Sequence, residues 1–169
     1  AASGAKGKPA LDGNYFAWWE APKNPKGVWT KHLIAEDQLG ATNIHPVDVN
    51  GDKQCDFIAS LGHGQGVVWF QGPDWKRHVI HDTIKEPHSL IALDFDGDGD
   101  QDAATCAFGS KEAYWFENDG KGTFTNHLVA KDQEAYDIRA ADLDGDQDLD
   151  LLIAGRGSNN VVWYENPRG

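Results

Sequence analysis

Short apolar stretches recur along the chain, rich in aromatic and β-branched residues and bounded by glycine, proline, asparagine or aspartate. Such stretches are typical of β-strands, and the bounding residues are typical of tight turns. Nowhere do apolar residues keep a helical spacing. The pattern therefore predicts an all-β chain with strands at 16–20, 29–34, 44–47, 57–61, 67–71, 75–80, 90–93, 103–107, 113–117, 124–129, 138–141, 151–154 and 161–165.

The predicted strands repeat with a fixed period. Trp18, Trp69, Trp115 and Trp163 follow one another at steps of 51, 46 and 48 residues. In a second series, an aromatic residue stands three positions before a histidine, at Trp29/His32, Trp75/His78 and Phe124/His127. Periodicity on this scale indicates a tandem array of similar units, each about 48 residues long.

Each unit holds four predicted antiparallel strands, and four-stranded units of this length form the blades of β-propellers. We therefore expect an all-β fold of about three and a quarter propeller blades. The predicted divisions are a flexible leader at 1–13, a partial blade at 14–41, full blades at 42–85 and 86–134, and a blade without its last strand at 135–169.

The predicted blade count does not close a ring, because a propeller needs at least four blades. Two interpretations remain open. The chain is either part of a longer propeller with flanking blades, or a subunit that completes its ring by self-association. Two copies would supply roughly 26 strands, close to the 28 of seven four-stranded blades.

Three nine-residue segments carry acidic or amide side chains at every odd position: loop 1 (48–56), loop 2 (94–102) and loop 3 (142–150). Glycine occupies position four of each loop, where a tight turn needs a residue without Cβ. The loops lie between the first and second predicted strands of their units. The candidate metal ligands are Asp48, Asn50, Asp52, Gln54 and Asp56 in loop 1, Asp94, Asp96, Asp98, Asp100 and Asp102 in loop 2, and Asp142, Asp144, Asp146, Asp148 and Asp150 in loop 3.

Carboxylates packed this closely repel one another unless a cation neutralises them. Oxygen ligands at positions one, three, five and nine, with a main-chain carbonyl at position seven, suit Ca²⁺. A single such loop could be an acidic surface loop that binds nothing, but three in phase argue against this. The loops hold 13 acidic residues and one basic residue, which accounts for the whole net charge of −12. We therefore predict up to three bound Ca²⁺ ions.

The acidic balance argues against nucleic acid as a partner, because phosphate binding requires basic patches. No apolar run approaches the length of a membrane span. Calcium sites of this kind function where Ca²⁺ is plentiful, so we expect a secreted protein, extracellular or periplasmic. Cys55 and Cys106 are offset by about 16 Å along equivalent strands, beyond disulfide reach, so we predict two free thiols.

The spacing Asp-x-Asp-Gly-Asp-Gly-x-x-Asp, followed by an apolar strand and then by Trp-Tyr/Phe-Glu-Asn, resembles the FG-GAP/VCBS repeat superfamily. The resemblance covers residues 14 to about 167. It implies a propeller with a calcium ion in each blade that carries a loop, as in integrin-type propellers, some fungal lectins and many secreted bacterial proteins. Loop 1 departs from the motif at Asn50 and at Gln54-Cys55, so we expect it to bind Ca²⁺ most weakly.

Other polar residues are predicted to gather on the face opposite the acidic loops, where binding residues would sit on connections held by a rigid scaffold. The candidates for ligand binding there are His45, His88, Asp137 and Arg139. In contrast, His32, His78 and His127 recur once per unit, which indicates a packing or hydrogen-bonding role. The repeated tryptophans are expected in the core between blades.

The resemblance favours a recognition module for carbohydrate or protein, with lectin-like binding. One alternative is the propeller domain or subunit of a sugar-processing enzyme of the dehydratase or lyase type, in which His45 and His88 would be the plausible catalytic members. Another is a purely structural, calcium-stabilised module. The sequence contains no nucleophile elbow, zinc-protease motif, P-loop or dinucleotide fingerprint.

Overall fold

The computed structural model describes residues 14–167, and all the regular structure in this part of the chain is β-strand. The predicted all-β class is confirmed, whereas the predicted leader at 1–13 lies outside the described residues. The strands are β1 (Phe16–Glu20), β2 (Thr30–Ala35), β3 (Asn43–Val47), β4 (Asp56–Ser60), β5 (Gln65–Gln71), β6 (Lys76–Lys85), β7 (Pro87–Leu93), β8 (Asp102–Ala107), β9 (Glu112–Asn118), β10 (Phe124–Lys131), β11 (Asp137–Ala141), β12 (Asp150–Gly155) and β13 (Asn160–Tyr164).

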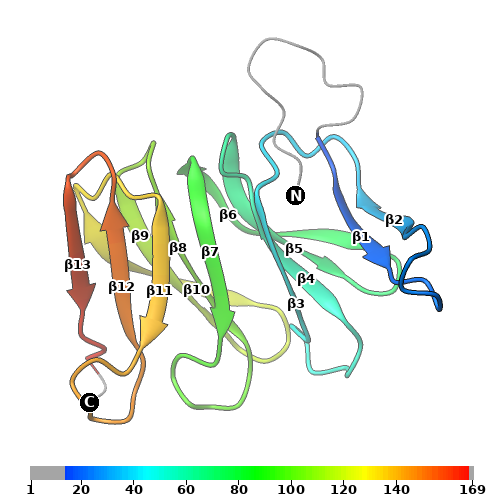
Figure 1. Ribbon diagram of the computed structural model, residues 1–169. Helices are drawn as coiled ribbons and strands as arrows, with labels where there is room; N and C mark the ends of the chain where they lie inside the picture. Colours follow the sequence, from blue (N-terminus) through cyan, green and yellow to red (C-terminus); the bar gives the residue numbers. More distant parts are fainter. Residues whose placement is uncertain (1–13, 168–169) are drawn as a thin grey trace.

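The strands form four antiparallel sheets in which neighbours in sequence pair with each other. β1 and β2 form a two-stranded sheet, β3 to β6 and β7 to β10 form four-stranded sheets, and β11 to β13 form a three-stranded sheet. The predicted four-stranded unit is therefore present twice in full. Residues 14–167 do not form a closed ring of sheets (Figure 1).

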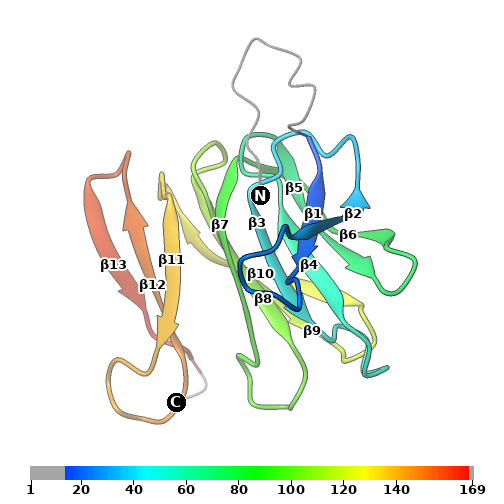
Figure 2. The ribbon, with the colours of Figure 1, turned by 45° about the vertical axis from the view of Figure 1, so that its right-hand side comes forward.

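The first strands of the three larger sheets, β3, β7 and β11, lie side by side and pack on each other (Figures 1 and 2). The later strands of each sheet lie farther from this row. Each of the two four-stranded sheets therefore presents one face to the sheet before it and the other to the sheet after it. This arrangement places equivalent residues of successive units at equivalent positions along the row.

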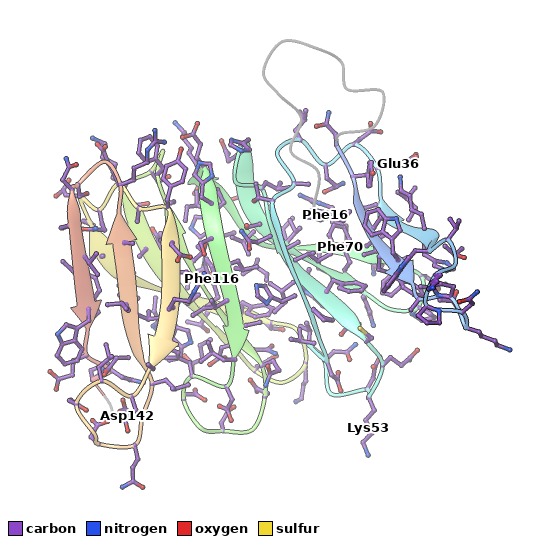
Figure 3. The ribbon with its side chains drawn as sticks, viewed as in Figure 1. Phe16, Glu36, Lys53, Phe70, Phe116 and Asp142 are labelled. Carbon is purple, nitrogen blue, oxygen red and sulfur yellow. The ribbon has the colours of Figure 1, made fainter. Side chains whose placement is uncertain are left out.

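Apolar side chains fill the three spaces between successive sheets. Phe16 and Phe70, with ring centroids 5.6 Å apart, lie between the first two sheets. Phe116 belongs to the cluster between the two four-stranded sheets, and Ile138 and Ile153 belong to the cluster beside the last sheet. Figure 3 shows Phe70 and Phe116 in the interior. Because these residues stand on alternating positions of strands, burial fixes the register of each sheet.

The repeated tryptophans are buried in only part of the series. Trp69 is 3% exposed and lies so close to Gly122 of the next sheet that a Cβ there would be 2.5 Å from the indole. Trp115 is half-buried against the last cluster. Trp18 and Trp163 are 37% and 45% exposed, so the predicted core role is wrong for these two. No sheet follows β13 in the described part of the chain, which leaves Trp163 uncovered.

Cys55 and Cys106 are both free thiols, as the strand offset predicts. Cys55 is exposed in loop 1, whereas Cys106 is buried in the core. Burial raises the pKa of the Cys106 thiol to about 12, so this thiol is an apolar packing group at neutral pH. Within residues 14–167 there is no helix that could cross a membrane.

Candidate metal centres in the acidic loops

The three acidic loops occupy equivalent places in the fold. Each connects the first strand of a sheet to the second, so loops 1, 2 and 3 follow β3, β7 and β11. Because these strands lie side by side, the loops lie along one side of the molecule. Lys53 of loop 1 and Asp142 of loop 3 mark this side in Figure 3.

The aspartate at position one holds the loop backbone in place. In loop 2, Asp94 Oδ1 accepts a hydrogen bond from Gly97 N at 2.7 Å, and Asp94 Oδ2 accepts one from Gly99 N at 3.0 Å. Asp48 and Asp142 accept the same pair of bonds in loops 1 and 3. The position-four glycines have φ of +74°, +77° and +90°, as the turn requires.

Position six also adopts a left-handed backbone conformation in every loop. Gly99 does so in loop 2 with φ of +97°, but Lys53 and Gln147 occupy the position in the other loops, with φ of 66° and 79°. The sequence analysis missed this turn because only one of the three residues is a glycine. Two non-glycine residues held there indicate that the hydrogen bonds to position one determine the loop conformation.

Carboxylates at positions one, three and five converge in two of the loops. Asp94, Asp96 and Asp98 each offer a carboxylate oxygen within 4.8 Å of the others, and the same holds for positions one, three and five of loop 3. Such a group of oxygens is suited to a hard divalent cation. The alternating spacing read from the sequence therefore corresponds to a real spatial cluster.

Position seven has buried carboxylate oxygens without hydrogen-bond donors. Asp100 Oδ1 and both carboxylate oxygens of Asp148 are buried without a partner. Burial, together with the negative charges of Asp98, Asp102 and Asp96, raises the pKa of Asp100 to about 7. Burial and neighbouring aspartates also raise the pKa of Asp148. A buried acceptor without a donor is costly, and a cation beside it would remove the cost. The residues of loops 2 and 3 therefore fit a bound Ca²⁺.

The raised pKa of Asp100 leads to a pH-dependence that can be measured. Without calcium, the folded protein binds a proton at Asp100 up to about pH 7, whereas the unfolded chain releases it near its ordinary pKa. The free energy of unfolding should therefore fall as the pH rises through this window. We expect the melting temperature in EDTA to fall as the pH rises from the ordinary range of an aspartate toward about pH 7, and to level off above it. The lowered pKa values of His78 and His88 act in the opposite direction at acidic pH.

Two further measurements test whether Asp100 causes this slope of melting temperature against pH. In excess calcium the slope should vanish or reverse, because the cation requires the ionised carboxylates. The Asp100→Asn variant should lose part of the slope in EDTA, since its side chain cannot titrate. A melting temperature in EDTA that is constant over this pH range would contradict the prediction.

The aspartate at position nine joins the loop to the third strand of its own sheet. Asp102 is 1% exposed, and its Oδ2 accepts hydrogen bonds from Phe95 N at 3.1 Å and Trp115 Nε1 at 3.2 Å. Its Oδ1 accepts one from Asn118 N at 2.8 Å. Asp56 and Asp150 likewise accept backbone bonds from position two and from the end of the third strand. Position nine thus has a structural role that the sequence analysis did not foresee, besides the ligand role predicted for it.

The asparagine of the Trp-Phe-Glu-Asn motif connects successive units. Asn118 Nδ2 donates to Val49 O of loop 1 at 2.7 Å and to Gln101 O of its own loop at 3.1 Å. Asn166 in the next unit donates to Phe95 O of loop 2 at 3.3 Å. Each asparagine therefore holds the loop of the preceding unit against its own sheet, which accounts for this residue in the motif.

Loop 1 differs from the others in its side chains but not in its backbone. Asn50 Nδ2 donates to Asp52 Oδ2 at 3.2 Å, so a side-chain amide at position three hydrogen bonds the position-five carboxylate, whereas position three is an aspartate in the other loops. Among the described residues of this loop there is no triplet of acidic groups like that in loops 2 and 3. Loop 1 therefore has less unbalanced charge for a cation to neutralise.

The candidate ligand-binding residues lie on the first strands rather than in loops. His45 is on β3, His88 on β7, and Asp137 and Arg139 on β11. His45 Nε2 hydrogen bonds Leu90 O at 2.7 Å, and Arg139 forms an ion pair with Asp137 at 2.6 Å. The structure thus brings the four onto neighbouring strands, and it pairs three of them with protein groups.

His88 belongs to a stack of side chains across three sheets that the sequence analysis did not anticipate. Its ring stacks on Tyr136 with centroids 4.1 Å apart, and His63 contacts it edge-on at 4.8 Å. The Arg156 guanidinium lies 4.9 Å from the centroid of the Tyr136 ring. Burial and the charges of His63 and Arg156 lower the pKa of His88, which favours the neutral form of the ring. Because β7 and β11 pack side by side, His88 at the start of β7 meets Tyr136 just before β11, and the connection after β4 adds His63.

The histidines that recur once per unit have the packing and hydrogen-bonding role predicted for them. His32, His78 and His127 lie opposite Trp18, Trp69 and Trp115 in the strand register, and each imidazole stacks on its indole with centroids 4.1, 4.2 and 4.5 Å apart. The histidine Nε2 also lies 3.0, 3.2 and 2.7 Å from a side-chain oxygen of Glu20, Gln71 and Glu117, respectively. We call this arrangement the Trp–His–acceptor unit.

Comparison with known proteins supports the resemblance read from the motifs. Residues 94–153, which include loops 2 and 3, match the FG-GAP-like repeat family. No curated protein matches the chain. Among solved structures, the chain is similar to the V. cholerae biofilm matrix protein Bap1, with a TM-score of 0.40 and 22% sequence identity over 73% of this chain and 18% of that one. The chain therefore spans less than a fifth of the length of Bap1.

Proposed function

From the FG-GAP-like repeat at residues 94–153, we propose that this chain is a calcium-binding β-propeller segment of a secreted protein and that it acts as a recognition module. In this proposal the four sheets are blades of a larger ring. The acidic loops bind Ca²⁺, and the calcium holds successive blades in a fixed relation. Carbohydrate or protein is the proposed class of ligand.

The observation that carries the calcium proposal is the set of buried carboxylate oxygens at position seven. Asp100 and Asp148 have no donor for these oxygens, although they lie in loops whose other carboxylates already converge. A cation is the group that would satisfy them all at once. Calcium suits the flexible arrangement of several carboxylates better than Mg²⁺, which demands near-ideal octahedral geometry.

Calcium binding would act directly on the contact between blades. Loop 1 is held by Asn118 of the following sheet, and loop 2 by Asn166, through the carbonyls of Val49 and Phe95 at position two. A calcium ion that orders a loop would therefore also fix the position of the carbonyl that accepts the asparagine hydrogen bond from the next sheet. Isothermal titration calorimetry tests the proposal, which expects binding of up to three Ca²⁺ per chain. Absence of calcium binding at millimolar concentration would refute it.

The three loops should differ in affinity. Loop 1 offers three carboxylates against five in each of the other loops, and Asn50 already hydrogen bonds one of them. We expect calorimetry of Asp48→Ala to show the loss of the weakest site, whereas the matched variants Asp94→Ala and Asp142→Ala lose tighter ones. Loss of the tightest site in Asp48→Ala would reverse the proposed ranking.

The proposed ligand site lies opposite the loops, around His45, His88, Asp137 and Arg139. Support comes from their position on the adjacent strands β3, β7 and β11, which places polar groups of three sheets together. A glycan array tests this site, with His88→Ala and Arg139→Ala as variants. Binding that both variants weaken supports recognition, whereas turnover of a sugar substrate would support an enzyme instead.

The proposed ring needs further blades, supplied by flanking repeats or by a second copy. Support comes from the uncovered face of the last sheet, where Val161 and Trp163 are 68% and 45% exposed. Leu143, at position two of loop 3, is 45% exposed, whereas the equivalent Val49 and Phe95 are buried under a following sheet. Light scattering in calcium tests self-association.

A further inference from the structure

The end of β9 and the turn that follows it, residues 118–122, lie on the side of the molecule that carries the acidic loops (Figure 1). Hydrogen bonds within this segment fix its shape. Gly122 N donates to Asn118 Oδ1 at 3.1 Å, and Lys121 N donates to Asp119 Oδ1 at 2.9 Å. We call residues 118–122 the bridging turn, because they contact both loop 2 of their own sheet and loop 1 of the preceding sheet.

The bridging turn contacts loop 2 at positions seven to nine. Asn118 N donates to Asp102 Oδ1 at 2.8 Å, and Asn118 Nδ2 donates to Gln101 O at 3.1 Å. Gly120 lies against position seven, since a Cβ on this glycine would be 3.0 Å from Asp100 Oδ2. The other oxygen of the same carboxylate, Asp100 Oδ1, is buried without a donor. A cation that orders this part of loop 2 would therefore also order the bridging turn.

The bridging turn also contacts loop 1, at positions two and four. Asn118 Nδ2 donates to Val49 O at 2.7 Å, and a Cβ on Gly51 would be 3.3 Å from Gly120 O. Gly51 N in turn donates to Asp48 Oδ1 at 2.9 Å. The side-chain amide of Asn118, a residue only 2% exposed, thus binds a carbonyl of loop 1 and a carbonyl of loop 2 at the same time.

We propose that calcium binding in loop 2 raises the calcium affinity of loop 1, and that the bridging turn transmits this coupling. An ion in loop 2 fixes the bridging turn, so the contacts that hold the backbone of loop 1 are already in place when loop 1 binds. Loop 1 then loses less conformational freedom on binding, which produces positive cooperativity. This inference rests on the proposed calcium binding and adds to it the order in which the loops fill.

Electrostatic repulsion between the ions would couple the two loops with the opposite sign. A divalent cation in loop 2 makes the surroundings of loop 1 less negative, which weakens the attraction of loop 1 for a second cation. At an ionic strength of about 0.15 M the screening length is only about 8 Å, so this repulsion is weakened between solvent-exposed loops. The sign of the coupling therefore distinguishes the bridging contacts from charge repulsion.

Loops 2 and 3 are joined in the same way by Asn166 of the last sheet. Asn166 Nδ2 donates to Phe95 O of loop 2 at 3.3 Å and to Leu149 O of loop 3 at 3.2 Å, and Asn166 N donates to Asp150 Oδ1 at 2.9 Å. Because the same bonds recur in two successive units, the link between loops is a property of the repeat. Loop 1 has the fewest carboxylates, so its filling should depend most on its neighbour.

A calcium titration followed by NMR tests the proposal, because every loop has a glycine amide at position four that reports its own filling: Gly51, Gly97 and Gly145. Asp98→Ala removes a carboxylate of loop 2 and keeps the bonds of the bridging turn, and the Gly97 amide shows whether loop 2 still fills. In this variant the calcium concentration that half-fills loop 1 should rise by about fivefold or more.

Two further variants identify the route of the coupling. Asp146→Ala, at the same position of loop 3, should shift the half-filling of loop 1 less than Asp98→Ala does, because the bridging turn joins loop 1 to loop 2. In an Asn118→Ala background, Asp98→Ala should no longer shift it, since the donor to both loops is gone. If Asn118→Ala does not fold, the comparison of Asp98→Ala with Asp146→Ala decides alone.

Several results would overturn the coupling. They are a loop 1 that never fills, a half-filling of loop 1 that Asp98→Ala leaves unchanged or lowers, and an equal shift in Asp98→Ala and Asp146→Ala. Calcium binding in loops 2 and 3 together with any of these results would refute the coupling alone. Absence of calcium binding at all three glycine reporters would refute the proposed calcium binding as well.

Discussion

Removal of calcium should lower the melting temperature of this protein by a large margin. Binding to the folded state alone stabilises it by about 2.7 kcal/mol for each site held at a hundredfold excess over its dissociation constant. For a chain of 169 residues, each such site corresponds to a shift of about 5–10 °C in melting temperature. Two filled sites in loops 2 and 3 would give about twice this shift, as long as they bind independently.

The measurement is a pair of thermal melts, one in EDTA and one in millimolar calcium. Mg²⁺ at the same concentration should give a smaller rise, because it demands tighter octahedral geometry than these loops offer. Ionic strength is matched with NaCl, which screens the repulsion between carboxylates without filling the loops. Identical melting curves in EDTA and in calcium would contradict calcium binding by the folded state.

Replacement of Asp102 should destabilise the protein even when no calcium is present. Its carboxylate accepts bonds from Phe95 N, Asn118 N and Trp115 Nε1, and the first two are buried backbone donors. Each buried donor left without a partner costs about 1–3 kcal/mol. We expect Asp102→Ala to lower the free energy of unfolding by roughly 3–5 kcal/mol in urea denaturation.

Asp98→Ala is the matched control, four positions earlier in the same loop. Asp98 is exposed and adds to the repulsion among the carboxylates, so its removal should leave stability in EDTA unchanged or slightly raised. In calcium the same variant should lose most of the stabilisation that loop 2 contributes. If Asp102→Ala destabilised the protein only in calcium, position nine would act as a metal ligand and not as the structural link inferred from its hydrogen bonds.

The packing role of His32, His78 and His127, which stack on tryptophan, could be predicted from the sequence repeat alone. Recurrence once per unit already argued for a packing role, because residues that serve a single binding site have no reason to recur in every unit. The acceptors Glu20, Gln71 and Glu117 recur at one spacing too, but their pairing with the histidines appears only when the third and fourth strands lie in register.

The position-nine aspartates and the motif asparagines show the opposite case. In the sequence, Asp102 is the last of five aspartates at alternating positions. Their spacing does not distinguish an aspartate that binds a metal from one whose buried carboxylate has a structural role. The role of Asp102 depends on the end of β9, 16 residues away, and that of Asn118 depends on Val49, 69 residues away. Contacts at such separations leave no local pattern for sequence analysis to detect.

By itself, the sequence determined the all-β class, the strand positions, the repeating unit and the three acidic loops. These follow from local rules, because strand alternation, turn glycines and closely spaced charges act over a few residues. Only the tertiary structure decided which tryptophans are covered, which carboxylate oxygens lack donors, and where the last sheet remains open. Those features depend on how one sheet packs against the next, and each sheet's neighbours are set by the fold as a whole.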